Sequence, residues 1–148
     1  MPVRSICFHS ETGNFRLKRP TVVRNWINDS ILASRKQTGN LNYIFCSDEF
    51  LLDINRRFLK HDYYTDIITF DYSEGKIISG DLYISIDRVK ENAETEQQPF
   101  ETELSRVMIH GVLHLMGHGD KEKKAKALMR KKEDKFLALL IPKKIKSK

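Results

Sequence analysis

The sequence predicts one α+β domain in which about five helices pack with a mixed sheet of about four strands. The chain has 148 residues, a length that suits one domain with a substantial core. Segments with helical apolar spacing alternate with short β-branched and aromatic runs. No repeat or linker divides the chain. We therefore expect a single domain over 1–140, followed by a disordered basic tail over 141–148.

The first half of the chain is expected to hold two strands and two helices. The loosely alternating segment 3–9 and the apolar run 41–47 each predict a strand. Pro20 suits the first turn of a helix, because apolar residues follow it at three- and four-residue spacing. Ser47 suits an N-cap and predicts a second helix directly after it. The buried face of that helix is expected to be Leu51, Leu52, Ile54, Phe58 and Leu59.

Two further strands and a short helix are expected next. The segments 65–72 and 78–86 read as strands, and the second alternates apolar and polar residues. Asp87 suits the cap of a helix that runs through Ala93. The alternation places one face of the second strand toward the core.

Two helices complete the predicted domain. Pro99 marks a break before a long helix over about 100–116, which Gly117 should end. A last helix is expected over about 121–140, before Pro142. The long helix is the most apolar segment of the chain, so we expect it to be the central one.

Composition excludes several classes of protein. The first residues lack the apolar run of a signal peptide, and no segment approaches the ~18–20 apolar residues of a membrane span. Cys7 and Cys46 lie far apart in apolar surroundings, which argues against a disulfide framework and a thiolate metal site. We therefore expect a cytoplasmic protein.

Positive charge is concentrated at the C-terminal end. The segment 121–148 holds twelve Lys or Arg and three Asp or Glu, a net charge of +9. The preceding part carries −3 of the total of +6. This asymmetry would steer a phosphate-bearing partner to the last helix, although a solvated helix face with a basic tail would look the same.

His110 and His114 form the most informative pair of residues. From 107 to 116 everything except these two and Gly111 is large and apolar, which is typical of a buried helix. A separation of four residues puts both imidazoles on one side of it, one turn apart. An unsatisfied buried polar group costs roughly 1–3 kcal/mol, and one metal ion satisfies both rings. The pair predicts a metal site on the central buried helix.

The third ligand must come from beyond this helix. Gly117 can adopt the positive φ that reverses the chain, and Asp120 follows with a carboxylate that could close the site. His118 is the alternative third ligand, but the break at Gly117 should remove its alignment with His114. If His118 is not a ligand, it can carry a proton or simply face solvent.

The residue after His110 argues against a protease. The metalloprotease motif HExxH has its general base, Glu, at this position, whereas this chain has Gly111. Glycine inside a helix costs about 1 kcal/mol relative to alanine. Its presence suggests that the substrate or a neighbouring strand approaches the backbone there.

The segment 110–120 reads HGVLHLMGHGD and resembles the pattern H-G-x-L-H-L-x-G-Y-D-H of the bacterial YbeY-type endoribonucleases of ribosomal RNA maturation. Two upstream features also match the family pattern. They are Asn55, ten residues before the strand TDIITF at 65–70, and Gly80-Asp81 ahead of the next strand. The order and spacing of these three features agree with the family pattern over about residues 55–133.

The chain departs from the family pattern at two positions. Asp120 stands where the family usually has its third histidine ligand, and zinc also accepts carboxylate oxygen. Leu59 stands where the family usually has an arginine that is thought to help catalysis. The nearby basic residues Arg56, Arg57 and Lys60 are candidates to replace that arginine.

The resemblance implies a zinc-dependent endoribonuclease that cuts single-stranded RNA, with one ion on His110, His114 and Asp120. It implies a role in maturing the 3′ end of the small-subunit ribosomal RNA and in ribosome quality control. The implied partner is the ribosome or its small subunit, with neither DNA nor a membrane. His118 and Arg57 are the catalytic candidates. The residues expected to hold RNA phosphates are Lys123, Lys124, Arg130 and Lys131.

One alternative from another class stays open on the sequence. The protein could be a non-catalytic ribosome-assembly factor in which the metal only braces the fold. A structural zinc site usually has four protein ligands, whereas a catalytic site keeps a water. Recruitment of His118 as a fourth ligand would favour this alternative.

Overall fold

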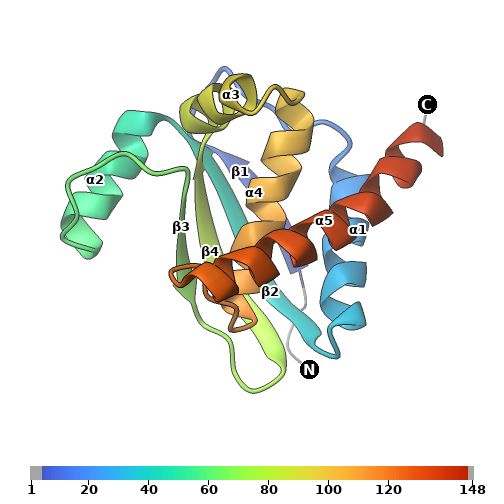
Figure 1. Ribbon diagram of the computed structural model, residues 1–148. Helices are drawn as coiled ribbons and strands as arrows, with labels where there is room; N and C mark the ends of the chain where they lie inside the picture. Colours follow the sequence, from blue (N-terminus) through green and yellow to red (C-terminus); the bar gives the residue numbers. More distant parts are fainter. Residues whose placement is uncertain (1–4, 147–148) are drawn as a thin grey trace.

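The computed structural model describes residues 5–146, with side chains described for residues 5–140 (Figure 1). Within that part, four strands and five helices form one α+β unit, which confirms the predicted fold class. Their order is β1 (Ser5–Ser10), α1 (Pro20–Ala33), β2 (Gln37–Cys46), α2 (Asp48–Phe58), β3 (Ile67–Asp71), β4 (Ile77–Ser85), α3 (Ile86–Thr95), α4 (Phe100–Leu115) and α5 (Lys123–Lys146).

The strands form one mixed sheet in the order β1-β2-β4-β3. β1 and β2 are parallel, as are β2 and β4, whereas β3 runs antiparallel to β4. Gln37 and Thr38 pair with Ile77 and Ile78. This pairing explains why β2 begins four residues before the predicted strand, because the partner strand supplies its hydrogen bonds.

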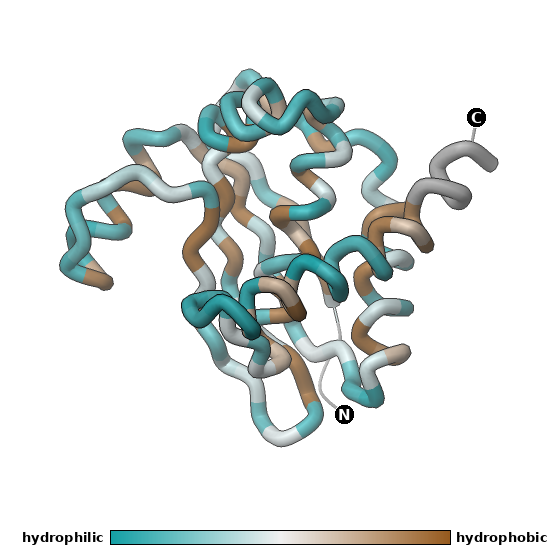
Figure 2. The backbone as a smooth tube through the Cα atoms, viewed as in Figure 1, coloured by the Kyte–Doolittle hydropathy of each residue, from teal (hydrophilic) through white to brown (hydrophobic). Residues whose placement is uncertain are grey.

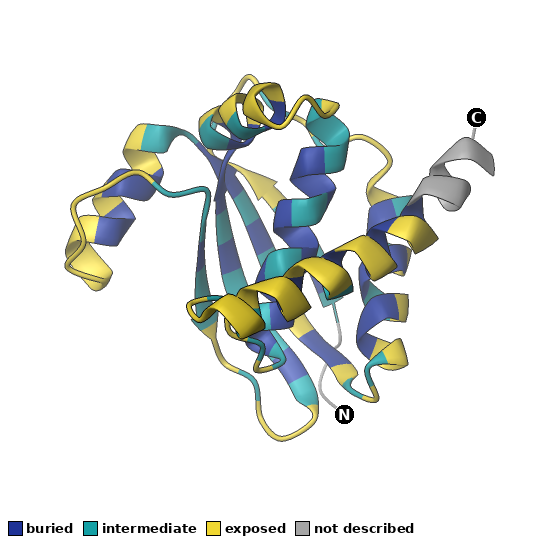
Figure 3. Cartoon of the chain, in the orientation of Figure 1, coloured by how far each residue is buried: buried dark blue, intermediate teal, exposed yellow. Residues whose placement is uncertain are grey.

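One face of the sheet carries the main core. Leu41, Tyr43 and Phe45 of β2 point to this face and are completely buried. Helix α1 packs on β2, α4 packs on β3 and β4, and α5 packs against both α1 and α4. Apolar segments of the strands and of α4 meet in this layer (Figure 2), while the outer surface of α5 is exposed (Figure 3). The helix that carries the histidines is therefore central, as predicted.

The opposite face of the sheet is covered in part by α2. Its Leu51 and Ile54 pack with Cys46 and Ile68 in a second, smaller cluster. Side chains alternate across a strand, so Ile68 faces α2 while its neighbour Ile67 packs against the main core. The sheet thus separates α2 from α4 and α5.

Of two predicted helix caps, one is confirmed and the other is wrong. Ser47 caps α2 through a hydrogen bond from Phe50 N to its Oγ, as predicted. The prediction that Asp87 caps α3 is wrong, because Ser85 occupies the cap and its Oγ accepts from Arg88 N. Asp87 lies in the first turn, and its carboxylate accepts a hydrogen bond from the Asp48 backbone N–H instead.

Two predictions, the first strand and the C-terminal tail, fall partly on residues that the structure does not describe. The first two residues of the strand expected over 3–9 lie outside the described residues. Helix α5 passes Leu140, where the sequence suggested an end, and extends to Lys146. Side chains beyond residue 140 are outside the described part, so the tail over 141–148 stays a prediction. Within the described residues, no helix combines the length and apolar character that crossing a membrane requires.

Candidate metal centre

Helix α4 presents His110 and His114 on its one accessible side. Its other faces are packed against the sheet and against α3 and α5, and residues such as Met108, Ile109 and Val112 are completely buried. The two histidine side chains are 22% and 29% exposed. Their ring centroids are 4.6 Å apart. The helix therefore fixes two neighbouring imidazoles at the edge of the core.

Gly111 explains how closely α4 approaches the sheet. A methyl group at this position would lie 2.6 Å from Leu82 Cδ2 and 2.7 Å from Ile67 Cδ1. Both are buried or half-buried side chains of β4 and β3. The glycine thus accommodates the neighbouring strands, which was one of the two explanations that the sequence offered.

The turn after α4 brings Asp120 back to the histidines. Gly117 has a φ of +98°, and its N–H donates to His114 O at 2.9 Å. The N–H of His118 then donates to Leu113 O at 3.0 Å. A side chain at Gly117 would be strained in this conformation, so the glycine is what allows the chain to reverse.

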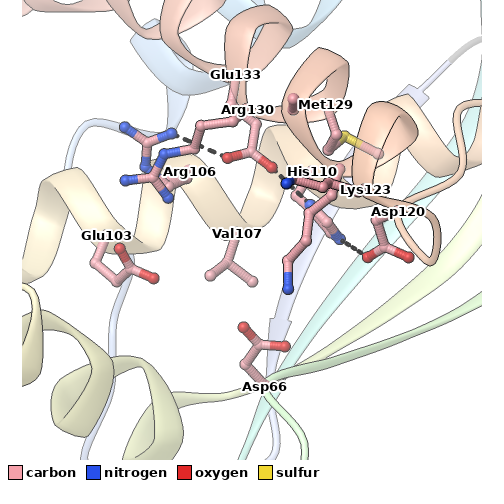
Figure 4. Close-up of a pocket in the computed structure, with 12 residues that line it drawn as sticks. Asp66, Glu103, Arg106, Val107, His110, Asp120, Lys123, Met129, Arg130 and Glu133 are labelled. Atoms are coloured by element: carbon pink, nitrogen blue, oxygen red, sulfur yellow. Dashed lines mark hydrogen bonds and ion pairs between the residues drawn. The ribbon is translucent and has the colours of Figure 1, made fainter.

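The three predicted ligands converge. Oδ2 of Asp120 lies 3.2 Å from Nε2 of His110 and 3.2 Å from Nε2 of His114. One ligand atom from each residue lies within 4.8 Å of the others. Figure 4 shows the Asp120 carboxylate beside His110. Two imidazole nitrogens and a carboxylate oxygen form a donor set that zinc accepts.

Glu133 of α5 determines how His110 is oriented. It is 5% exposed, and its Oε2 lies 2.6 Å from Nδ1 of His110 while its Oε1 accepts from Arg106 at 2.9 Å. A carboxylate can only accept, so Nδ1 of His110 carries the proton in this contact. Burial lowers the pKa of His110, but the hydrogen bond and charge of Glu133 outweigh it and raise the pKa overall.

When His110 is neutral, this arrangement leaves its Nε2 as an acceptor facing the Asp120 carboxylate. Two acceptors at 3.2 Å repel each other unless a proton or cation lies between them. A metal ion bound there would remove the repulsion, and the buried Glu133 would then hold the ligand in its metal-binding tautomer. The residues present therefore fit a metal ion.

His118 lies outside the ligand group. Its side chain is not part of the cluster of convergent ligand atoms. Burial lowers its pKa, and the nearby positive charges of Lys132 and Lys36 and the neighbouring His114 lower it further. The break at Gly117 thus separates it from the ligand face of α4, as the sequence suggested.

The structure does not bring Arg57 to the metal-ligand group. Arg57 lies on α2, pairs with Asp53 at 3.2 Å, and lines a separate hollow with Phe58 and Phe70. Leu59 is the C-cap of the same helix and is 41% exposed. The sheet stands between α2 and α4, the helix that holds both histidines, and neither Arg57 nor Leu59 lines the cleft beside them.

A cleft of about 490 Å³ opens beside the ligand group. His110 and Asp120 line it, together with two of the four residues expected to hold phosphates, Lys123 and Arg130. The other two, Lys124 and Lys131, are exposed and do not line it. The remaining lining residues are Asp66, Glu103, Arg106, Val107, Lys126, Ala127, Met129 and Glu133.

Asp66 and Glu103 give the cleft an acidic side (Figure 4). Burial raises the pKa of both carboxyls above the usual range. Asp66 also accepts a long hydrogen bond of 3.4 Å from Asn92 of α3. The charged form of each acid is therefore poorly solvated on this side of the cleft.

Sequence reasoning missed Glu133 and Lys126. The sequence does contain a signal for Glu133, because it occupies a position in the apolar stripe of α5 that carries Met129, Phe136, Leu137 and Leu140. A lone carboxylate in such a stripe requires a buried partner. Lys126 has no comparable signal, since lysines surround it on the whole segment.

Comparison with known proteins gives one family. A sequence model described as Endoribonuclease YbeY matches residues 7–140. A relative from Flavobacterium psychrophilum named Endoribonuclease YbeY is 52% identical over 85% of this chain and 90% of its own length. One from Cytophaga hutchinsonii with the same name is 50% identical over 94% and 98%.

A solved structure agrees with this result. The solution structure of TM1509 from Thermotoga maritima superimposes with a TM-score of 0.66 at 26% identity, covering 97% of this chain and 93% of that one. The fold, the convergent His-His-Asp group and the relatives point the same way. The chain belongs to the Endoribonuclease YbeY family.

Proposed function

We propose that this protein is a zinc-dependent endoribonuclease that cuts single-stranded RNA and acts in ribosomal RNA processing. The observation that carries the proposal is the convergence of His110, His114 and Asp120 at one end of a cleft with a basic side. Relatives that cover most of the chain are named endoribonucleases. Binding of the ribosome or its small subunit, and a location in the cytoplasm, belong to the same proposal.

The number of ligands supports a catalytic site over a structural one. Three protein ligands leave a position open, whereas structural zinc sites usually have four. His118, the candidate fourth ligand, is not part of the convergent group. When bound at such a site, zinc acts as a Lewis acid toward a phosphoryl oxygen and lowers the pKa of water toward about 7.

The residues around the site would each contribute a separate property. Asp120 would neutralise part of the charge of a bound ion, and Glu133 would hold His110 in one tautomer. Cations that line the cleft would hold and orient the phosphodiester, and they stabilise negative charge that develops on it. His118, next to this group, is proposed to exchange protons with the substrate or solvent. Arg57 lies on α2 and lines a separate hollow, so its position gives no support to a catalytic role. That role stays a prediction from the resemblance.

Metal analysis combined with an RNA cleavage assay tests the proposal. We expect purified protein to hold about one equivalent of zinc and to cleave single-stranded RNA. His114→Ala should lose both, because it removes one of three ligands. His9→Ala is the matched control, since His9 is exposed on β1 and contributes to no ligand cluster in the described part of the chain.

Two results would contradict the proposal. Full cleavage by His114→Ala protein shown to be metal-free would exclude a metal-dependent reaction at this site. Metal spectroscopy that finds four protein ligands, together with no RNA cleavage, would instead favour the ribosome-assembly factor with a structural metal. Cleavage of generic peptides is not expected, because Gly111 replaces the protease base.

A further inference from the structure

We propose that a single RNA strand lies in the cleft with its phosphates on a row of three cations along α5. Lys123, Lys126 and Arg130 form this α5 cation row. A second stripe consists of Lys124, Lys131 and Lys135, and we place it outside the binding site. The proposal rests on the proposed function, since it names how that site receives its substrate.

Helix geometry separates the two sets of basic residues. Lys126 and Arg130 follow Lys123 by three and seven residues, so all three lie on one side of α5 over about 10 Å. Each residue advances about 100° around a helix, so Lys124 and Lys131 lie about a quarter turn away from Lys123 and Arg130. The cleft is lined by the α5 cation row and by no member of the second stripe.

The charges of the row are available for a ligand. None of its three side chains forms an ion pair within 4 Å with another residue in the described part of the chain. Arg106, the fourth cation that lines the cleft, is held by Glu133 at 2.9 Å and by Asp134 at 2.8 Å. Free positive charge in the cleft therefore comes from α5.

The opposite side of the cleft gives the strand an orientation. The carboxyls of Asp66 and Glu103 line that side, and Glu103 is only 7% exposed. Phosphates would be repelled there and attracted to α5. Val107 and Met129 also line the cleft, and both are almost completely buried. A backbone on α5 then directs ribose and bases toward the carboxylates, which can accept hydrogen bonds from hydroxyl or amino groups.

The cation row is continuous with the metal ligands. Lys123 follows Asp120 by three residues, and both line the cleft together with His110. A strand that follows the row from Arg130 to Lys123 therefore arrives at the three convergent ligand atoms. This continuity links substrate binding to the position of cleavage without any contact that reads sequence.

Binding measurements on two triple variants test the inference. One variant combines Lys123→Gln, Lys126→Gln and Arg130→Gln, and the control combines Lys124→Gln, Lys131→Gln and Lys135→Gln. Both remove three positive charges from exposed positions of the same helix. A fluorescent oligouridylate is titrated into each full-length protein after chelator treatment, with anisotropy as the readout over a range of salt concentrations. Circular dichroism and thermal melting verify that both variants fold.

We expect the row variant to bind about tenfold or more weakly than the control at moderate salt. The slope of log affinity against log salt should decrease by about two, because each single-strand phosphate contact contributes about 0.7. Equal losses in the two variants, or a larger loss in the control, would overturn the inference. Because cleavage is not measured, a protein that binds through the row but cuts no RNA would contradict only the proposed function.

Discussion

Glu133 shows how one buried side chain can prepare a metal ligand from a different helix. It is among the few charged residues of the described core, and it contacts both Arg106 and His110 of α4. Arg106 offsets its charge, and the hydrogen bond to His110 fixes the protonated nitrogen. Carboxylates in this relation to a ligating histidine raise its basicity and hold its ring.

We expect Glu133→Gln to weaken zinc binding by about 10- to 100-fold, the usual effect of losing such a partner. The amide keeps the shape but removes the negative charge that favours the Nδ1-protonated ring. Competition with a chromogenic chelator measures the affinity, and NMR of the His110 imidazole reports its tautomer.

Asp134→Asn provides the control for this experiment. Asp134 pairs with the same Arg106 at 2.8 Å but has no contact with His110 among the described interactions. We expect its zinc affinity to stay within about twofold of wild type. Unchanged zinc affinity and tautomer in Glu133→Gln would show that Glu133 serves only the packing of α5.

At the scale of elements, two serine N-caps differ in whether they also contact a second helix. Ser47 Oγ accepts from Phe50 N at the start of α2. Ser85 Oγ accepts from Arg88 N at the start of α3 and also donates to Asp48 Oδ1 at 2.6 Å. Asp48 in turn pairs with Arg88 at 2.7 Å. The Ser85 cap therefore connects the starts of α2 and α3, whereas the Ser47 cap is local.

We expect Ser47→Ala to lower the free energy of unfolding by about 1 kcal/mol, the usual cost of a lost N-cap. Ser85→Ala should cost about 2 kcal/mol, because it also removes a hydrogen bond to a charged acceptor at a completely buried position. Urea unfolding followed by circular dichroism measures both. A smaller loss for Ser85→Ala than for Ser47→Ala would contradict this account of the Asp48 contact.

At the scale of the whole molecule, α5 joins the two halves of the helical layer. Trp26 of α1 is completely buried, and its indole N–H donates to Phe136 O of α5 at 2.7 Å. The same helix contributes Glu133 to α4 and the cation row to the cleft. Docking of α5 therefore completes the core, places Glu133 against the metal ligand His110 and forms the basic side of the cleft.

Burial of Glu103 on the acidic side of the cleft should make the free energy of unfolding depend on pH. Burial raises the pKa of Glu103 above its ordinary value of 4.5, so the folded chain retains a proton that the unfolded chain releases. The contribution of Glu103 to stability is therefore lost as pH rises from 4.5 through the raised pKa. Above the raised pKa the folded chain carries a poorly solvated charge there.

We expect metal-free Glu103→Gln protein to be more stable than metal-free wild type at pH 7. The difference should shrink as the pH falls below the ordinary carboxyl range, where the wild-type side chain is neutral in both states. Urea unfolding of both proteins across this pH range provides the measurement. A difference that does not change with pH, or one that grows in acid, would contradict the burial of a charged Glu103.

The fold could largely be predicted because its signals are local. Helical apolar spacing, the Ser47 cap and the runs of β-branched and aromatic residues depend on neighbours along the chain, and each produced the expected element. The start of β2 and the cap of α3 were missed. Gln37 becomes part of a strand by pairing with β4, and Ser85 displaces Asp87 because Asp87 binds the start of α2.

The metal-ligand group could be predicted for the same reason. His110, His114, Gly117 and Asp120 lie within eleven residues, so one helix and one turn determine their geometry. The partners of this group could not be predicted, since Glu133 reaches His110 from another helix across 23 positions. Sorting the basic residues of α5 into those inside and outside the cleft likewise required the position of α5 on α4.

The sequence by itself thus determined the elements and a compact set of convergent metal ligands, because helix periodicity and a glycine turn act over short distances. Only the tertiary structure decided which carboxylate supports His110, which cations face the cleft and that Arg57 lies apart from it. Those relations depend on how helices dock on the sheet. Docking is set by burial summed over the whole core, and no short segment of the chain contains that information.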